Sequence, residues 1–167
     1  MEKILIIGSS GSGKSTFANK LGKALNREVV HLDKVYYKSG WQEDHSTRDE
    51  WKQKVRDLVS KDRWIIDGHY NSTLNIRIPA ADTIIFFDFS KLTCLYRVLK
   101  RAMDKAQPFD KPEGNFNKLS WNLIKKIIIF SKKKVWNHLE PYKDTKKIFV
   151  VKNSKEAENL LKKLAII

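Results

Sequence analysis

The sequence predicts an α/β protein of three layers, in which helices cover both faces of a parallel sheet of five strands. Short runs of almost wholly apolar residues recur along the chain, as in strands that are buried on both faces. Segments with apolar residues at helical spacing stand between these runs, and parallel strands need such crossover connections. The first apolar run also leads directly into a glycine-rich segment and then into a helical pattern.

The first part of the chain alternates strands and helices. Residues 3–7 contain the run Ile-Leu-Ile-Ile and are the first expected strand. Residues 14–25 follow as a helix, because their apolar side chains recur every three or four positions. Residues 28–32 are the second strand, which ends at Asp33. A helix with acidic residues in its first turn is then expected over residues 46–60.

The middle of the chain contains the next two strands. The third strand covers residues 64–66 and closes on Asp67. Residues 71–77 are expected to form a short polar connection. The fourth strand covers residues 83–87 and ends on Asp88.

A helix is expected from Lys91, and several large apolar side chains share one of its faces. These are Leu92, Leu95, Tyr96, Leu99 and Met103. The same helix carries Cys94, which is expected to be a small buried side chain. Residues 107–117 contain two prolines and a glycine and therefore interrupt the helical pattern.

The last part of the chain contains a strand between two helical segments. A helix is expected to begin near Ser120, to break near Ser131 and to end before Pro141. Residues 148–151 are the fifth strand, and Ser154 caps a final amphipathic helix. No linker or repeat divides the chain, so residues 1–167 are expected to form one domain.

The glycine-rich segment fits the phosphate-binding pattern G-x-x-x-x-G-K-[ST] in its required context of strand, loop and helix. Its glycines allow backbone N–H groups to turn toward phosphate oxygens. Lys14 is expected to reach the β- and γ-phosphates, and the Ser15 hydroxyl to ligate Mg²⁺. The alternative is a glycine- and serine-rich turn that precedes a lysine by chance. The expected residues that bind ATP, or another nucleoside triphosphate, are Gly8, Ser9, Ser10, Gly11, Ser12, Gly13, Lys14, Ser15 and Thr16.

Carboxylates follow three of the expected strands at the edge where ligands of parallel sheets bind. Asp33 is placed to accept a proton from an attacking hydroxyl or to hold a Mg²⁺-bound water; the alternative is a turn or helix cap. Asp67 has the position of a carboxylate that holds Mg²⁺ through water, and its alternative is an Asp-Gly turn.

Arginine and aromatic residues complete the expected site. Arg77 is a candidate clamp for an acidic substrate, and the alternative is a solvated loop arginine. Arg97 and Arg101 lie four residues apart on one helix face and are candidates to contact the transferred phosphoryl group, although a solvated basic face is the alternative. Trp41 and Tyr70 could stack on a flat substrate or pack in the core or the lid. His31 and His69 are expected to be hydrogen-bonding neighbours of the site, because two histidines alone make a poor metal site.

Charge and cysteine content limit the possible environments and partners. The net charge is +14, and residues 91–147 hold 15 Lys/Arg against 5 Asp/Glu, a balance of +10. This basic region could attract nucleic acid or close over a polyphosphate. The single cysteine excludes an internal disulfide, and no apolar run is long enough to span a membrane. A cytoplasmic protein without a membrane partner is expected.

Five segments together resemble the bacterial topology modulation protein family, which is related to adenylate kinases. They are His31–Asp33, Gly40–Trp41, Trp64–Tyr70, Thr83–Asp88 and Cys94–Arg101. The resemblance covers most of residues 3–165. It implies a nucleoside monophosphate kinase-like fold with strand order 2-3-1-4-5 and bound ATP. It also places Asn153 beside the adenine, although an Asn before a helix can equally be its cap. The proline- and glycine-containing segment 107–117 could let the following helix swing as a lid, so a helical lid is expected over about residues 102–140.

The chain departs from adenylate kinases directly after its Asp-Gly pair. His69 and Tyr70 stand where those enzymes continue with an aromatic residue and Pro-Arg, and the nearest downstream arginine is Arg77. This departure argues against a nucleoside monophosphate as the acceptor.

Two functions are compatible with these features. The first is a kinase that transfers the γ-phosphoryl group of Mg-ATP to a small molecule or nucleotide. The second is a nucleotide-regulated protein that contacts nucleic acid through residues 91–147, although no nucleic-acid-binding motif supports it. A hydrolase is less favoured, because no residue stands out to position a water. Apolar residues at 121 and 127–130 are a candidate surface for self-association, so the expected state is a monomer or homodimer.

Overall fold

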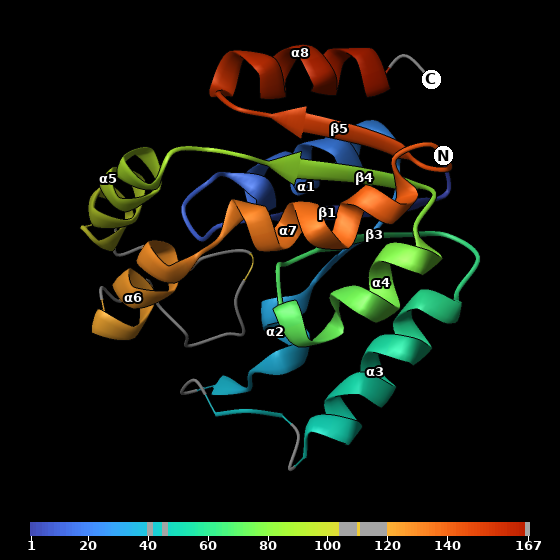
Figure 1. Ribbon diagram of the computed structural model, residues 1–167, viewed down its shortest axis with the longest axis horizontal. Coiled ribbons are helices and arrows are strands. Elements are labelled where there is room, and N and C mark those ends of the chain that lie inside the picture. The colour runs from blue at the N-terminus through green and yellow to red at the C-terminus, as the bar shows by residue number, and fades with distance from the viewer. Residues whose placement is uncertain (40–41, 45–46, 104–109, 111–119, 166–167) are drawn as a thin grey trace.

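The computed structural model describes residues 1–39, 42–44, 47–103, 110 and 120–165 (Figure 1). The strands are β1 (Lys3–Gly8), β2 (Val29–His31), β3 (Trp64–Asp67), β4 (Thr83–Phe87) and β5 (Lys147–Val151). The α-helices are α1 (Lys14–Ala24), α2 (Leu32–Tyr36), α3 (Arg48–Ser60), α4 (Leu74–Ala80), α5 (Lys91–Ala102), α6 (Trp121–Ile129), α7 (Lys132–Leu139) and α8 (Ser154–Ala165). Short 3₁₀ turns are η2 (Asn71–Thr73) and η3 (Glu140–Tyr142).

The five strands form one parallel sheet in the order β2-β3-β1-β4-β5, which confirms the predicted fold class and strand order. The register pairs Ile6 of β1 with Asp67 of β3 and with Ile85 of β4. After β1 the chain therefore forms β2 and β3 on one side of this strand, and later β4 and β5 on its other side. In such sheets the ligand site lies beyond the carboxyl ends of the strands, where the order reverses. Figure 1 shows α5 and α6 beyond these ends.

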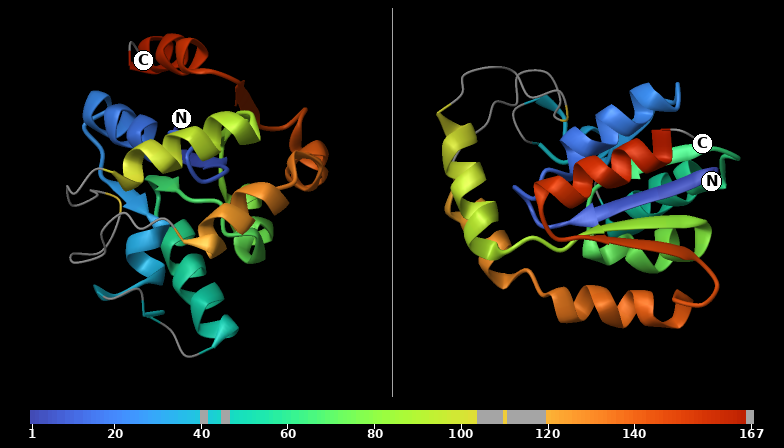
Figure 2. Two further views of the ribbon diagram at one scale, coloured as in Figure 1. Left: turned by 90° about the vertical axis from the view of Figure 1, so that its left-hand side faces the viewer. Right: turned by 90° about the horizontal axis from the view of Figure 1, so that it is seen from above.

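Two hydrophobic layers hold the sheet between helices, as alternation along the strands requires. In β1, Ile4 and Ile6 face a cluster with α1, α5 and α8, whereas Leu5 and Ile7 face a cluster with α3, α4 and α7. All four side chains are fully buried. The right panel of Figure 2 shows α1 and α8 on one side of the strands and α7 on the other. No helix among the described residues is long and apolar enough to cross a membrane.

The helix α5 packs on the phosphate-binding segment through its small side chains. Cys94 and Val98 are buried, and a Cβ on Gly11 would lie 2.4 Å from the Cys94 carbonyl oxygen. Gly11 also has φ +80°, a conformation that side chains disfavour. Most large apolar side chains on the expected face point away from the core, although Leu95 packs against it. Those at least 49% exposed are Leu92, Tyr96, Leu99 and Met103.

Two segments differ from the sequence-based prediction. The second strand ends at His31 and not at Asp33, because Leu32 turns into the core as the first residue of α2. Residues 71–77 are not a polar connection but contain η2 and the start of α4. Leu74 and Ile78 lie four positions apart and are both buried, so this short helix covers the sheet.

The helical region after α5 divides into two helices of different character. The expected break is confirmed, since α6 ends at Ile129 and Ser131 caps α7. Val135 and Leu139 of α7 are fully buried, so α7 belongs to a core layer and could not swing as part of a lid without exposing them. In α6 only Ile127 is buried. Most of the connection between α5 and α6 lies outside the described residues.

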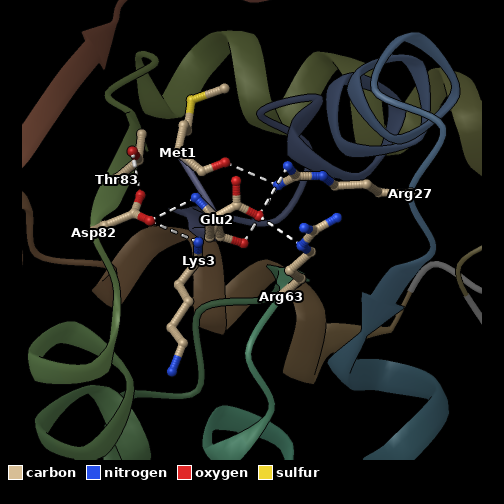
Figure 3. Close-up of polar contacts among 7 residues, drawn as sticks. All are labelled: Met1, Glu2, Lys3, Arg27, Arg63, Asp82 and Thr83. Carbon is tan, nitrogen blue, oxygen red and sulfur yellow. Dashed lines mark hydrogen bonds and ion pairs between the residues drawn. The ribbon is translucent and has the colours of Figure 1, made fainter.

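Polar contacts fix the start of β1, at the end of the sheet opposite the phosphate-binding segment (Figure 3). The Asp82 carboxylate accepts hydrogen bonds from the backbone N–H groups of Glu2 (2.6 Å) and Lys3 (2.8 Å). The Glu2 carboxylate forms ion pairs with Arg27 (3.0 Å) and Arg63 (3.1 Å). These contacts join the turns before β2, β3 and β4 to the central strand.

Candidate active site

The phosphate-binding segment connects β1 to α1 with the predicted geometry. Gly13 is the N-cap of α1, has φ +93° and carries no side chain to cap the helix. The first N–H groups of α1 are therefore available to an anion, and Lys14 and Ser15 occupy its first turn. Ser15 is half-buried and Thr16 is exposed. Within the described part of the chain, the buried hydroxyl oxygens of Ser9 and Ser12 have no hydrogen-bond partner.

Asp67 ends β3 beside this segment and is 3% exposed. Its Oδ2 is hydrogen-bonded to His31 Nδ1 (2.9 Å), and His31 Nε2 is hydrogen-bonded to Asn19 Oδ1 (3.1 Å). The register of β2 and β3 places His31 directly beside Asp67. His31 is thus a hydrogen-bonding neighbour, as expected. Asn19 was not expected, although it follows Ser15 by four positions and so shares its helix face.

Electrostatics keep Asp67 ionised despite its burial. Burial alone raises the pKa of a carboxyl group, but the charge of Lys14 and hydrogen bonds from His31 and Ser15 hold the pKa of Asp67 below its usual range. Among the described residues, no group donates a hydrogen bond to the buried Asp67 Oδ1. A hydroxyl oxygen beside an ionised carboxylate with a free oxygen is the kind of donor set that suits a hydrated Mg²⁺. Ser15 and Asp67 therefore fit this ion.

Asp33 lies in the first turn of α2, on the other side of β3 from β1. Its Oδ1 accepts a hydrogen bond of 2.6 Å from the Tyr70 hydroxyl. The Tyr70 ring packs against the rings of Tyr36 (centroids 4.8 Å apart) and Trp51 (5.2 Å). Burial raises the pKa of Tyr70, so the hydroxyl keeps its proton and remains a donor. Tyr70 therefore orients Asp33 and packs among aromatic rings, which is one of the two alternatives that the sequence left open for it.

Arg77 is fully buried and does not face a ligand, which corrects its prediction as a substrate clamp. Its guanidinium donates to the carbonyl oxygens of Gly68 (2.7 Å) and Tyr70 (2.9 Å), to that of His69, and to the Thr73 hydroxyl (3.2 Å). These bonds fix the segment after β3, including Tyr70, which has φ +30°. Arg77 therefore acts on the site indirectly, by holding the backbone that positions Tyr70.

His69 lies between the phosphate-binding segment and the end of α6. Its ring is 4.9 Å from that of Phe130, and its buried Nδ1 has no hydrogen-bond partner among the residues that the structure describes. Burial, with the positive charges of Arg77 and Lys14, lowers the pKa of His69 to about 4. The imidazole is therefore neutral at neutral pH and packs as a ring, whereas the sequence suggested a hydrogen-bonding neighbour.

Arg97 and Arg101 lie on one face of α5 but differ in their contacts. Arg97 donates to the Ser12 carbonyl oxygen (2.8 Å) and to the Ser154 hydroxyl (2.8 Å), and its guanidinium lies 4.7 Å from the centre of the Phe89 ring. It therefore joins the phosphate-binding segment to the start of α8. Arg101 is half-buried and has no hydrogen bond or ion pair with a described residue.

Asn153 precedes α8 and caps it. Its Oδ1 accepts from the Glu156 N–H (3.0 Å), and its Nδ2 donates to Glu156 Oε1 (2.7 Å). The bond between Arg97 and Ser154 brings α5 next to this loop, so a base bound there would lie beside Arg97. Asp88, at the end of β4, forms an ion pair with Lys132 of α7. Trp41, the other aromatic candidate, lies outside the described residues.

The sheet order and this site define a P-loop protein with a kinase-like fold. A family model for an AAA domain matches residues 4–118, which is more than half of the chain, and the chain belongs to this AAA domain family. No curated protein sequence matches the chain.

Solved structures with the same fold include two kinases. A gluconokinase from Sinorhizobium meliloti 1021 is 17% identical with a TM-score of 0.56, over 99% of this chain and 94% of that chain. A deoxyadenosine kinase from M. mycoides, with dCMP and dCDP bound, is 16% identical with a TM-score of 0.53, over 96% and 97%. Kti12 from Chaetomium thermophilum in complex with ADP-AlF3 is 11% identical with a TM-score of 0.56, over 96% of each chain. At these identities the likeness concerns the fold alone.

Proposed function

We propose that the protein is a kinase that transfers the γ-phosphoryl group of Mg-ATP to a small molecule or nucleotide. The observation that carries this proposal is the position of two carboxylates at the carboxyl ends of β2 and β3. Asp67 lies beside Lys14 and Ser15 of the phosphate-binding segment, and Asp33 lies on the far side of β3. In this proposal the first carboxylate serves the nucleotide, and the second is assigned to the acceptor.

Each part of the site has a distinct role in this proposal. Lys14 and the N–H groups of the loop bind the β- and γ-phosphates. Ser15 and Asp67 would hold Mg²⁺, which would neutralise charge on the phosphate oxygens. Asp33 accepts the proton of the attacking group, and Tyr70 keeps its carboxylate oriented. Arg101 contacts the transferred phosphoryl group, whereas Arg97 borders the nucleotide base.

The resemblance to the topology modulation protein family supports the same assignment, and we place the chain in that group as part of the proposal. The cytoplasm is the proposed location, since ATP is the proposed donor.

The first test is nucleotide binding. We expect Mg-ATP to bind the wild-type protein in calorimetry, and Lys14→Ala to weaken binding roughly 10- to 100-fold through loss of a charge-assisted hydrogen bond to phosphate. Lys20→Ala is the matched control, because Lys20 is exposed on the same helix. The proposal is wrong if millimolar Mg-ATP gives neither heat nor thermal stabilisation of the wild type.

A further inference from the structure

We infer that the exposed sides of α5 and α6 form a docking surface for an anionic lipid bilayer, on which the protein lies without crossing it. The sequence led us to expect no membrane partner because no apolar run can span a bilayer, but binding to the surface of a bilayer requires no such run. The inference stands apart from the proposed kinase function, and its test uses no phosphoryl transfer.

Large apolar side chains are exposed almost entirely on these two helices. Of the eight that are exposed in the described part of the chain, seven lie on α5, on its C-cap residue and on α6. A single exposed apolar side chain is ordinary, but such a concentration marks a site of protein or membrane contact. The seven side chains define the α5–α6 surface and are 49% to 84% exposed: Leu92, Tyr96, Leu99, Met103, Trp121, Ile128 and Ile129.

On α5 the exposed apolar side chains form one stripe. They recur every three or four positions from Leu92 to Met103 and therefore share one side of the helix. The buried Cys94 and Val98 lie on the opposite side. Arg97, which contacts the phosphate-binding segment, also lies off the stripe. The α5–α6 surface is therefore separate from the candidate active site.

The exposed side of α6 continues this stripe. Ile127 of α6 is buried in the same hydrophobic cluster as Cys94 and Val98 of α5, so both helices turn one side toward this cluster and the other side away from it. The two helices lie next to each other (Figure 1), and the Lys91 ammonium group of α5 donates to the Ile128 carbonyl oxygen of α6. The apolar side chains of two adjacent helices thus make one surface.

The charges that α5, α6 and α7 contribute are all positive. Residues 91–103 and 120–139 contain 9 Lys/Arg and no Asp or Glu. Lys100 follows Tyr96 by four positions and Lys125 follows Trp121 by four, so these exposed lysines lie beside the apolar side chains. The stem of a lysine can lie along an apolar surface while its ammonium group reaches a lipid phosphate. Apolar side chains bordered by lysines are typical of helices that lie in the headgroup region of anionic bilayers.

The charges also decide between a bilayer and a second copy of the chain. In a symmetric dimer the same surface contacts itself, so the cations of one copy would face those of the other, without a carboxylate from these helices between them. An anionic bilayer instead offers acyl chains to the apolar side chains and phosphates to the lysines. Trp121 and Tyr96 combine an apolar ring with a polar group, and such side chains are enriched at membrane interfaces.

The test is co-sedimentation of the full chain with phosphatidylcholine vesicles, with and without about one quarter phosphatidylglycerol. We expect binding to the anionic vesicles at about 0.15 M salt, and roughly tenfold weaker binding to the neutral ones. The double variant Leu92→Ser, Ile129→Ser should weaken binding roughly tenfold or more, through loss of buried apolar area. Lys100→Gln and Lys125→Gln should each weaken it about fivefold. Lys20→Gln, at an exposed position of α1, is the matched control and should bind like the wild type.

Tryptophan fluorescence locates the contact. Anionic vesicles should shift the emission to shorter wavelength, Trp121→Phe should abolish this shift, and Trp136→Phe of α7 should retain it. The inference fails if the wild type does not bind anionic vesicles, if it binds neutral vesicles equally well, or if the double variant at Leu92 and Ile129 binds unchanged. It also fails if light scattering finds a wild-type dimer that this double variant dissociates, because a second copy would then occupy the surface. Because the replaced side chains are exposed, the variants should keep the wild-type Tm.

Discussion

The buried guanidinium of Arg77 shows how one side chain can determine the chemistry of a site without touching a ligand. It holds the carbonyl groups of residues 68–70 and so fixes the unusual backbone of Tyr70. Tyr70 then presents its hydroxyl to Asp33. Burial lowers the pKa of Arg77, and the nearby Tyr70 and Asp67 oppose this shift. The side chain that the sequence suggested for substrate binding is thus a positioning residue.

Variants of Arg97 and Arg101 should differ in their effects on turnover and ATP affinity, because among the residues that the structure describes Arg97 has hydrogen-bond partners and Arg101 has none. We predict that Arg101→Ala lowers turnover at least tenfold and leaves the affinity for ATP almost unchanged, since its contact forms with the transferred group. Arg97→Ala should instead weaken ATP binding, because it releases the Ser12 carbonyl and the start of α8. Single-turnover kinetics and calorimetry measure the two effects. Equal effects of the two variants on ATP affinity would contradict this division.

At the scale of elements, α6 and α7 should respond differently to nucleotide. Trp121 and Ile129 of α6 are 78% and 74% exposed, whereas Val135 and Leu139 of α7 are fully buried. We predict that a non-hydrolysable ATP analogue slows hydrogen exchange in α6 and leaves α7 unchanged, because only the weakly packed helix can be ordered further. The helix α7 is the internal control. Slower exchange in α6 with duplex DNA, but not with nucleotide, would favour a nucleic-acid partner.

The elements that the sequence predicted best are those whose signal is local. The apolar strands and the glycine pattern of the phosphate-binding segment depend on neighbours in the sequence, and the structure confirms the expected strand order. The sequence did not predict which face of α5 packs against the rest of the protein. Periodicity identifies such a face but does not say which face packs, and here the small Cys94 fits against Gly11 while Leu92 and Met103 stay exposed.

The site was predictable where residues end strands, and less so where side chains from distant segments meet. Asp67 follows a strand directly, so its place at the carboxyl edge could be read from the sequence. The roles of Asn19, Tyr70 and Arg77 could not, because they depend on how α1, α2 and α4 lie around the sheet. Arg77 in particular lies in a segment whose polar composition concealed a short buried helix.

At the scale of the whole molecule, the candidate site lies at the carboxyl ends of the strands, and purely structural contacts lie at their amino ends. There the Asp82 carboxylate accepts hydrogen bonds from two backbone N–H groups and from the Thr83 hydroxyl (2.6 Å). Burial alone raises the pKa of Asp82, but these hydrogen bonds, from Thr83 first, hold the pKa below its usual value. The bonds therefore stabilise the fold above the ordinary carboxyl pKa of about 3.9, and this contribution is lost as the pH falls through the lower folded-state value.

We predict that Asp82→Asn lowers the free energy of unfolding by about 1 kcal/mol at pH 7, through weaker hydrogen bonds to an uncharged acceptor. The difference from the wild type should shrink as the pH falls below about 4, because the carboxyl of the unfolded wild type then takes up a proton while that of the folded protein, with its lower pKa, follows only at lower pH. Urea unfolding at pH 7 and pH 3 measures both quantities, with Asp62→Asn as the exposed control. A difference that persists undiminished at pH 3 would show that charge is not the cause.

Because α5 lies so close to Gly11, the reactivity of the Cys94 thiol reports whether this helix moves away from the phosphate-binding segment. Cys94 is the single cysteine, it is buried in this contact, and burial raises the pKa of its thiol. A thiol reagent can therefore alkylate the protein only when α5 lifts from the loop. We predict slow labelling of the folded protein, slower still with Mg-ATP, and faster labelling in Arg97→Ala, which loses the bond between α5 and the loop. Mass spectrometry of the intact chain over time would record this opening without any added probe.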